Sequence, residues 1–278
     1  MLDFNRRGLW RNSNATVRAS ITPTTVPIVV YVHNRPAYLR EVLTRLSRVD
    51  GIAESLLIVS HDGYFPEVVA VVREFTFMRI KQRTTSKNSF PSRSPDDCPG
   101  TPSPITPAPD GCTGDSDQYD NFRNPFFVGL KHHWFWLMNQ VWDEMEEFQN
   151  FDGHICFLEE DHLVVPNAYR TLQVLIAVKN ARCPDCVAVS LSTGHRAHSP
   201  GVLGGEHFVA DRMSNMGYAF NRTVWRRIKA QARKFCGFDD YGWDWTLECA
   251  VMASWAPGTL SLHAAGASVI HAGRVTHR

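Results

Sequence analysis

The sequence predicts an α/β fold built around a parallel, doubly wound sheet. Short β-branched runs alternate with segments whose apolar residues follow helical spacing, a pattern typical of repeated β-α-β units. Polar residues such as His33 and Asp62 come directly after the first two runs. Open parallel sheets bind their ligands at the carboxyl ends of their strands. We therefore expect the functional residues to gather at one edge of the sheet.

The first part of the sheet is predicted from residues 26–80. Val26–Val32 is a β-branched apolar run, typical of a buried strand. Pro36 suits the first turn of the helix expected over Ala37–Val49. The next elements are a strand at Ser55–Ser60, a helix at Glu67–Phe75 and a strand at Phe77–Ile80. Residues 1–25 are polar, show no periodicity and are expected to form a tail or stem remnant.

The second part follows a segment over residues 83–124 that is rich in Ser, Pro, Asp and Gly and reads as a long loop. Loops of that length tend to be functional or disordered. Pro125–Phe148 then carries the longest helical pattern in the chain. The remaining predicted elements are strands at Ile155–Leu158, Val187–Leu191 and Asn215–Phe220, and helices at Asn167–Lys179 and Thr223–Lys234. A final short strand within Val269–Gly273 is expected to end in His271.

Length and composition narrow the functional classes. The chain has 278 residues, a formal charge of +1 and 44% hydrophobic residues, which allows about 1–2 domains with a sizeable core. The balanced charge and the lack of a basic stripe disfavour nucleic acid as a partner. The sequence contains neither an apolar run of roughly 18 residues nor an N-terminal signal peptide. A lumenal protein needs one of these, so the chain is expected to be either a fragment or cytosolic.

The seven cysteines favour an oxidising compartment. Cys98 and Cys112 bracket a loop rich in Pro, Gly and Asp, which reads as a disulfide-closed loop. Cys183 and Cys186 form a lone Cys-X-X-Cys motif, which is weak as a zinc site without a second pair. We expect a local disulfide there. Two Asn-X-Thr sequons permit a secretory setting.

Three carboxylates and an imidazole follow the predicted strand at Ile155–Leu158, namely Glu159, Glu160, Asp161 and His162. Gathering like charges at a strand end costs desolvation and repulsion, which a bound cation offsets. A solvated turn is the alternative, and it is favoured when the acidic triplet is considered alone. The neighbouring motifs decide between the two.

A second polar cluster lies in the long helical pattern, where Lys131 is followed by His132 and His133. Three cationic or hydrogen-bonding groups near a helix start suit a phosphate or a sugar. A solvated polar face is the alternative. The tryptophans and other aromatics around them are interpreted as core packing.

A third motif places Asp244 between Trp243 and Trp245. Apolar neighbours raise the pKa of a carboxyl group and present flat faces to sugar rings. Transfer from a nucleoside-diphosphate sugar needs a cation on the diphosphate and a base on the opposite face of the sugar carbon. Asp161 suits the first role and Asp244 the second. Two such centres with a sugar between them predict inversion at that carbon.

The chain resembles the N-acetylglucosaminyltransferase II family over residues 26–273. The segments that carry the resemblance occur in the family's order: Val32-His33-Asn34-Arg35-Pro36, Ser60-His61-Asp62, Lys131-His132-His133-Trp134, Phe157-Leu158-Glu159-Glu160-Asp161-His162, Asn215-Met216-Gly217, Asp239-Asp240-Tyr241-Gly242-Trp243-Asp244-Trp245-Thr246-Leu247 and His271-Ala272-Gly273. Because the motifs occur together and cover most of the chain, the resemblance is specific.

The resemblance implies a GT-A glycosyltransferase fold, a Rossmann-like mixed sheet flanked by helices. Residues 26–278 would form a single catalytic domain, truncated at its C-terminus relative to the family. The donor would be UDP-N-acetylglucosamine (UDP-GlcNAc), the cofactor Mn²⁺, and the acceptor the 2-hydroxyl of the α-1,6-arm mannose of a hybrid N-glycan. The expected location is the Golgi lumen, with membrane attachment as a type II protein through an anchor that this sequence does not contain.

The resemblance also assigns roles to individual residues. It implies that Asp161 and His271 ligate the metal, that Asp244 is the general base, and that His162 is structural. The nucleotide-sugar would be contacted by Tyr31, Val32, His33, Asn34, Arg35, Asp62, Gly129, Leu130, Lys131, His132, His133, Glu159, Glu160 and either Arg196 or His198.

The same resemblance matches the spacing of the Cys98–Cys112 and Cys183–Cys186 pairs, and it leaves Cys236 without its family partner. The chain departs from the family at Tyr31, which replaces a Gln. It departs again at Gly242, which replaces an Asn.

Two other functions are kept open. The first is a non-catalytic, truncated carbohydrate-binding relative, and the second is a related transferase with another acceptor.

Overall fold

The computed structural model describes most of the chain, in two compact units. The described residues are 21–84, 125–193, 208–238, 242–255 and 260–274. The first unit, here called the sheet unit, comprises residues 1–85, 150–224 and 259–278, and the second, the helical unit, comprises residues 86–149 and 225–258. That residues 26–278 form a single catalytic domain stays a prediction.

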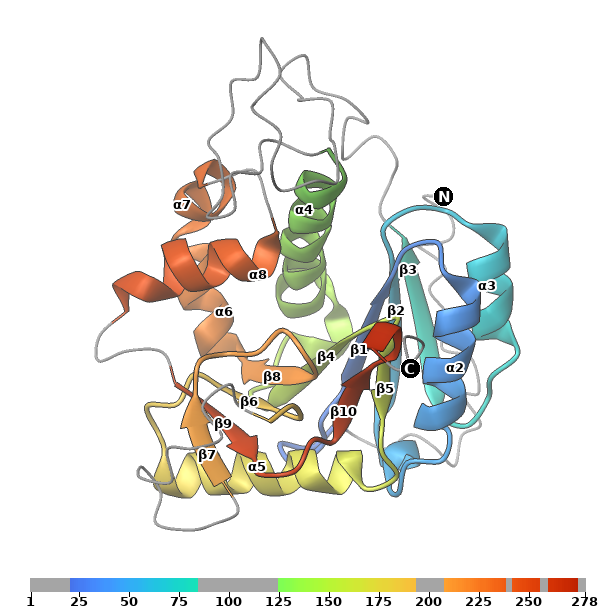
Figure 1. Cartoon of the computed structure of the whole chain (residues 1–278), viewed down its shortest axis with the longest axis horizontal. Coiled ribbons are helices and arrows are strands. Elements are labelled where there is room, and N and C mark those ends of the chain that lie inside the picture. Colours follow the sequence, from blue (N-terminus) through green and yellow to red (C-terminus); the bar gives the residue numbers. More distant parts are fainter. Residues whose placement is uncertain (1–20, 85–124, 194–207, 239–241, 256–259, 275–278) are drawn as a thin grey trace. The chain divides into compact units, whose positions relative to one another are not determined.

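The sheet unit is built on an eight-stranded sheet in the order β3-β2-β1-β4-β8-β6-β9-β7 (Figure 1). Its strands are β1 (Ile28–Val32), β2 (Leu56–His61), β3 (Arg79–Thr84), β4 (His154–Glu159), β6 (Ala188–Ser190), β7 (Phe208–Asp211), β8 (Tyr218–Asn221) and β9 (Ser261–Ala264). The first four strands in this order are parallel, whereas β8 runs antiparallel to both β4 and β6. The mixed sheet flanked by helices that the resemblance implies is confirmed. The parallel pairing predicted from the alternation over residues 26–80 is confirmed for β1, β2 and β3, whereas the sheet as a whole is mixed.

Helices α2 (Pro36–Leu46) and α3 (Pro66–Arg73) pack side by side in the sheet unit, and both start with a proline (Figure 1). Proline suits the first helical turn, whose backbone N–H groups have no partner within the helix. The predicted apolar stripe of α2 is buried, and it comprises Leu39, Val42, Leu43 and Leu46. A third helix, α5 (Ala168–Arg182), contacts β6 and β9. These helices close the core over the central strands.

A separate two-stranded antiparallel sheet joins β5 (His162–Val164) to β10 (Val269–His271). The sequence predicted β10 as a short strand ending in His271, and the chain turns into a 3-10 helix at Ala272–Arg274 directly after it. Strands β5, β7 and β9 were not predicted. The strand predicted at Asn215–Phe220 begins only at Tyr218, after Gly217, whose φ is 58°.

The helical unit is built around α4 (Pro125–Asn139). The long predicted helix does not run unbroken to Phe148, because a π-helical turn over Gln140–Glu144 ends at Met145 in extended conformation. A 3-10 turn at Glu146–Phe148 follows. The remaining helices are α7 (Ala232–Gly237) and α8 (Trp243–Thr246), the latter continued by a π-helical turn at Leu247–Val251 and a 3-10 turn at Met252–Ser254.

Helix α6 (Arg222–Lys229) runs across the boundary between the two units. The single helix predicted at Thr223–Lys234 is therefore two helices, α6 and α7. The break follows from a tightened last turn, in which the Gln231 N–H donates to Ile228 O at 2.9 Å. Trp225 and Lys229 both donate to Asp143 Oδ2 at 2.9 Å, which ties α6 to the π-helical turn after α4.

The cysteines are partly described. Cys183 and Cys186 form a disulfide directly after α5, with Cα atoms 5.3 Å apart, so the predicted local disulfide is confirmed. Cys236 is an exposed free thiol. Cys98 and Cys112 lie outside the described residues.

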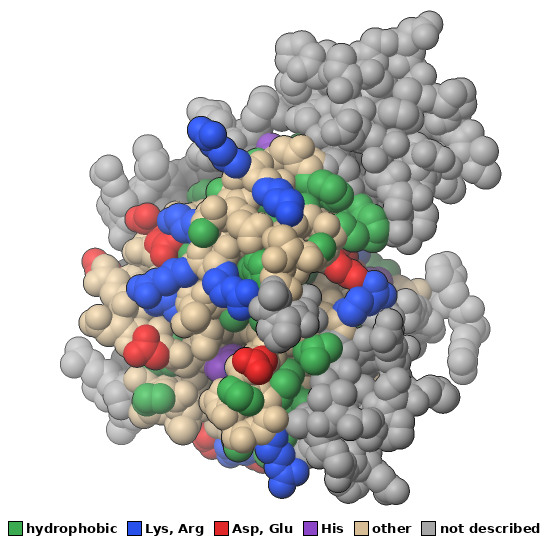
Figure 2. All heavy atoms as spheres, turned by 90° about the vertical axis from the view of Figure 1, so that its left-hand side faces the viewer, with side chains coloured by type: hydrophobic (Ala, Val, Ile, Leu, Met, Phe, Trp, Pro, Cys, Tyr) green, Lys and Arg blue, Asp and Glu red, His purple; other side chains and the backbone are tan. Residues whose placement is uncertain are grey.

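The surface shows mixed charge, and the helices bear on whether the chain crosses a membrane. On the face displayed in Figure 2, lysine and arginine side chains lie among acidic ones. Within the described ranges, the helices are too short or too polar to cross a bilayer.

Candidate functional site

Three neighbouring strands end at the same edge of the sheet unit and deliver most of the predicted site residues. In the parallel pairing, Val32 of β1 lies opposite His61 of β2, and Tyr31 lies opposite Glu159 of β4. The residues that follow these strand ends therefore gather at one edge, as predicted. The edge lies where the chain order changes direction, since β2 and β3 lie on one side of β1 and β4 on the other.

His33 and Asp62 form a close pair at the ends of β1 and β2. His33 Nδ1 lies 2.7 Å from both carboxylate oxygens of Asp62. The hydrogen bond to Asp62 raises the pKa of His33 above its ordinary value. The ring of Phe65 meets the His33 ring edge-on, with centroids 5.2 Å apart. Two residues predicted to contact the nucleotide-sugar are thus brought together.

Glu160 is buried at the end of β4, and both of its oxygens have partners. The His33 N–H donates to Oε2 at 2.9 Å, and Arg35 Nε donates to Oε1 at 2.5 Å. Burial raises the pKa of Glu160, and the bond to Arg35 opposes that rise. These bonds give Glu160 the role of an anchor between β4 and the segment after β1. Whether it also contacts a donor sugar stays a prediction.

Asp161 and His271 meet through the two-stranded sheet. His271 of β10 lies opposite His162 of β5, one residue after Asp161. Its Nε2 therefore comes within 3.4 Å of Asp161 Oδ2, although the two residues are far apart in the sequence. The Ala272 N–H also donates to the Asp161 carbonyl at 2.8 Å. The two residues predicted to hold the metal are neighbours in the structure.

The Asp161 carboxylate is suited to a cation. It is 2% exposed, and its Oδ1 accepts no hydrogen bond in the part of the chain that the structure describes. A buried carboxylate oxygen without a donor is costly unless a cation or water completes it. Two ligand atoms bound to a small divalent ion at right angles lie about 3 Å apart, close to the separation of Asp161 Oδ2 and His271 Nε2. The residues present therefore fit a hard divalent cation.

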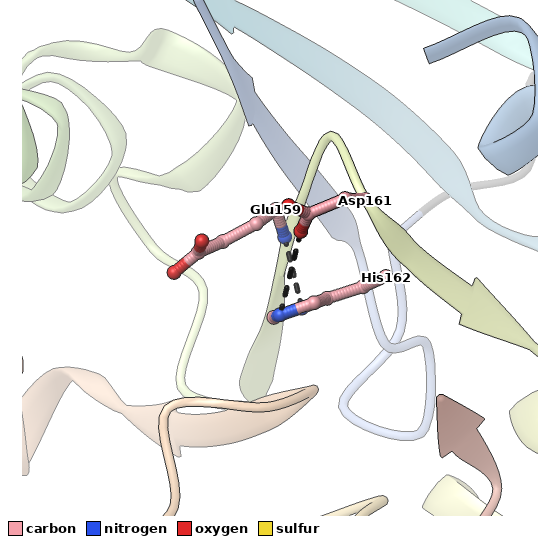
Figure 3. Close-up of side chains that lie close together, drawn as sticks. All are labelled: Glu159, Asp161 and His162. Carbon is pink, nitrogen blue, oxygen red and sulfur yellow. Dashed lines mark hydrogen bonds and ion pairs between the residues drawn. The ribbon is translucent and has the colours of Figure 1, made fainter. Parts of the chain in front are cut away.

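Glu159, Asp161 and His162 form a second group in which one ligand atom from each lies within 4.8 Å of the others (Figure 3). His162 is 1% exposed, and burial lowers its pKa to about 4, so its ring is neutral at pH 7. Its Nδ1 accepts the Glu159 N–H at 3.0 Å. A neutral imidazole carries one ring proton, so Nε2 holds it and offers no lone pair. This geometry agrees with the structural role predicted for His162.

Tyr31 orients the third acid of the motif. Its hydroxyl donates to Glu159 Oε1 at 2.9 Å. Burial, followed by the charge of Glu159, raises the pKa of Tyr31 well above its ordinary value, and Tyr218 of β8 is a further hydrogen-bond partner. Sequence reasoning did not identify Tyr218, because the pairing of β8 with β4 leaves no local signal in the sequence.

The candidate base lies in the helical unit. Asp244 is half-buried in the first turn of α8, and its Oδ1 accepts the Trp245 N–H at 2.9 Å. The preceding residue, Trp243, stacks on Trp134 of α4 with ring centroids 5.0 Å apart. A Cβ at Gly242 would lie 2.8 Å from Asp244 Oδ1, so the glycine makes room for this carboxylate position.

The Lys131–His133 segment lies in the same unit, but in the second turn of α4 rather than at the helix start, since α4 begins at Pro125. Lys131 is buried, and its Nζ donates to the Phe238 carbonyl at 3.3 Å. His133 is also buried and stacks on Trp136, with centroids 6.0 Å apart. Both side chains therefore pack within the helical unit, and their predicted donor contacts stay predictions.

The other predicted donor contacts are Gly129, Leu130 and His132, which are half-buried, Asn34, which is exposed, and Val32, which is buried in β1. Arg196 and His198 lie outside the described residues, so the choice between them stays open. The donor-contact role of each of these residues stays a prediction.

Comparison with known proteins identifies similar chains. The family model for N-acetylglucosaminyltransferase II matches residues 2–278. An Arabidopsis thaliana protein named alpha-1,6-mannosyl-glycoprotein 2-beta-N-acetylglucosaminyltransferase is 42% identical over 98% of this chain and 64% of its own length. The Mus musculus protein of the same name is 32% identical over 84% of this chain and 55% of its own. The chain therefore spans between about half and two thirds of these relatives.

Solved structures resemble the chain more distantly. Staphylococcus aureus TarS is 13% identical with a TM-score of 0.44, covering 88% of this chain and 60% of that one. The mannosyltransferase PcManGT from Pyrobaculum calidifontis, in complex with GDP-Man and Mn²⁺, is 14% identical with a TM-score of 0.40, covering 79% and 55%. Likenesses this weak assign neither fold nor function.

Proposed function

The chain belongs to the N-acetylglucosaminyltransferase II family, and on that basis we propose that it is an inverting glycosyltransferase with a GT-A catalytic domain. It would transfer N-acetylglucosamine from UDP-GlcNAc to the 2-hydroxyl of the α-1,6-arm mannose of a hybrid N-glycan in the Golgi lumen. The observation that carries the proposal is the meeting of Asp161 and His271 at the edge where parallel strands end.

Asp161 and His271 are the residues that would hold Mn²⁺, which neutralises the diphosphate of the donor when bound. Asp161 contributes Oδ2 of a buried carboxylate, and His271 contributes Nε2 of a half-exposed ring, 3.4 Å from that oxygen. Glu159 and Glu160 lie beside them, but Tyr31, His33 and Arg35 hold their oxygens.

His33 and Asp62 would position the nucleotide part of the donor. Their mutual hydrogen bond fixes both side chains at the end of β1 and β2. A carboxylate held in place by a neighbouring ring accepts hydrogen bonds from a sugar hydroxyl or a base N–H without losing further side-chain freedom. Burial against Phe65 limits rotation of the His33 ring.

Asp244 would act as the general base. It takes the proton from the mannose 2-hydroxyl as that oxygen forms a bond to C1 of N-acetylglucosamine. The bond between C1 and the phosphate oxygen breaks, and UDP leaves with the electron pair. Because the attacking oxygen approaches opposite the leaving group, the configuration at C1 inverts. The stack of Trp243 on Trp134 keeps the start of α8 in place.

The test uses labelled UDP-GlcNAc, Mn²⁺ and a defined hybrid glycan. We expect Asp161→Ala to lose both metal-dependent donor binding and transfer, and Asp244→Ala to keep donor binding but lose at least about 100-fold in transfer rate. Asp152→Ala, an exposed acid of the sheet unit, is the matched control. Full transfer by Asp244→Ala would refute the assigned base. Donor binding without any product in the wild type would instead support the non-catalytic relative, and transfer only to a different glycan would support another acceptor.

A further inference from the structure

Arg35 contacts both buried acids of the site at once. Its Nε donates to Glu160 Oε1 at 2.5 Å, and its Nη1 lies 2.8 Å from Asp161 Oδ2. The two carboxylates are each 3% exposed in their side chains, whereas Arg35 is 43% exposed. The half-exposed guanidinium of Arg35 therefore bridges the buried carboxylates of Glu160 and Asp161.

The oxygen that Arg35 occupies is the one that faces His271. Asp161 Oδ2 lies 2.8 Å from Arg35 Nη1 and 3.4 Å from His271 Nε2. A divalent ion shared by Asp161 and His271 would have to bind beside this oxygen. The Arg35 guanidinium already contacts this oxygen through Nη1. A divalent ion at the same carboxylate oxygen would be repelled by that positive charge.

We propose that Arg35 is a placeholder cation, which occupies Asp161 in the metal-free protein and competes with the divalent ion for it. The inference rests on the proposed function, since it assumes that Asp161 and His271 hold the metal. In this role Arg35 is a positioning residue. It holds the two acids in place until the metal binds, and it sets how tightly the metal binds.

The geometry gives Arg35 a way to release Asp161 without leaving the site. Nε and Nη1 belong to one planar guanidinium, and each contacts a different acid, Nε Glu160 and Nη1 Asp161. Glu160 is held in turn by the His33 N–H at 2.9 Å. The guanidinium also lies over the Tyr38 ring, 5.3 Å from its centroid, on the solvent side. A tilt of the whole guanidinium can therefore lengthen the contact from Nη1 to Asp161 while the group stays beside Glu160.

The test measures Mn²⁺ binding by the purified protein without nucleotide, by electron paramagnetic resonance of free Mn²⁺, together with thermal unfolding in EDTA. Arg35→Met removes the competing charge, so we expect Mn²⁺ to bind about fivefold tighter than to the wild type. The same variant should melt at a lower temperature in EDTA, because Glu160 and Asp161 lose their cation. Arg35→Lys, a single point charge that cannot bridge both acids, should be intermediate in both measurements.

Arg40→Met is the matched control, because it removes the same charge from α2, the helix that follows Arg35, where Arg40 forms an exposed pair with Glu74. It should leave Mn²⁺ affinity unchanged. Weaker or unchanged Mn²⁺ binding by Arg35→Met overturns the placeholder role and would show that the metal binds through the other oxygen, with Arg35 as a support. An unchanged melting temperature in EDTA overturns it too. Failure of the wild type itself to bind Mn²⁺ would instead contradict the metal site of the proposed function, and the placeholder role with it.

Discussion

Acidification should destabilise the protein through His154, and the size of the effect follows from its burial. His154 begins β4 and is 5% exposed, and its Nε2 has no hydrogen-bond partner within the described residues. Burial, and then the charge of the nearby Lys179, lower its pKa from 6.5 to about 3. Lys179 is itself buried, and desolvation lowers its pKa as well.

The sign follows from proton linkage. Between pH 6.5 and pH 3 the unfolded chain binds a proton at His154 that the folded protein does not, so stability falls as pH falls through this window. The contribution of neutral His154 to the unfolding free energy is fully present above pH 6.5. At pH 5 the loss from this one residue amounts to about 2 kcal/mol, which is a large share of a typical unfolding free energy of about 5–15 kcal/mol.

Urea denaturation of the wild type and of His154→Gln at pH 7.5 and pH 5.0 measures this loss. The drop in unfolding free energy between the two pH values should be about 2 kcal/mol smaller in the variant. His154→Leu should show the same smaller drop, because it also removes the titrating ring, even if its absolute stability differs from that of His154→Gln. An equal drop in all three proteins would refute the reasoning and would place the acid sensitivity in other groups.

Two further substitutions test local geometry. Gly217→Ala should lower the unfolding free energy measured in urea by about 1–3 kcal/mol. Gly217 has φ 58°, and an added Cβ would lie 3.1 Å from Leu191 and 3.3 Å from Val269. An unchanged urea midpoint would contradict this prediction. Gly242→Ala should lower the transfer rate but leave the KM for the donor unchanged. The reason is that the new Cβ would lie 2.8 Å from Asp244 Oδ1 and would displace that carboxylate. A higher KM at an unchanged rate would contradict this and would assign Gly242 to donor binding.

Strands β1 and β4 were predicted from apolar runs. All five residues of β1 are buried, and β4 is buried up to its last residue. Burial on both faces leaves a continuous apolar run that the sequence shows directly. Strands β5, β7 and β9 have only three or four residues each, and β5 pairs with a strand that lies far away in the chain. Their stability comes from partners that no local pattern reveals.

The sequence predicted which residues belong to the candidate site, but it did not predict most of the contacts between them. The acids after β4 stand out in the sequence, whereas their link to His271 follows only from the family resemblance, because the pairing of β5 with β10 leaves no local signal. Arg35 was expected to contact the donor, and its hold on Glu160 and Asp161 follows from strand order, which places the ends of β1 and β4 side by side. Lys131 was expected to suit a phosphate or a sugar, or to lie on a solvated face; it is buried in α4, so the solvated face is wrong, and the donor contact stays a prediction.

His162 and His271 both lie next to Asp161, and both accept a backbone N–H at Nδ1. They differ in solvent exposure, and this difference decides which ring could ligate a metal through Nε2. In both, Nδ1 accepts a backbone N–H, from Glu159 at 3.0 Å for His162 and from Gly273 at 3.1 Å for His271. A neutral ring in this state carries its proton on Nε2, so ligation through Nε2 requires that Nδ1 give up its bond and take the proton. His162, at 1% exposure, has no room to do so, whereas His271 is 39% exposed in its side chain. Under the proposed function, metal binding would therefore require two releases, that of the Gly273 N–H by His271 and that of Asp161 by Arg35, while the buried acids stay in place.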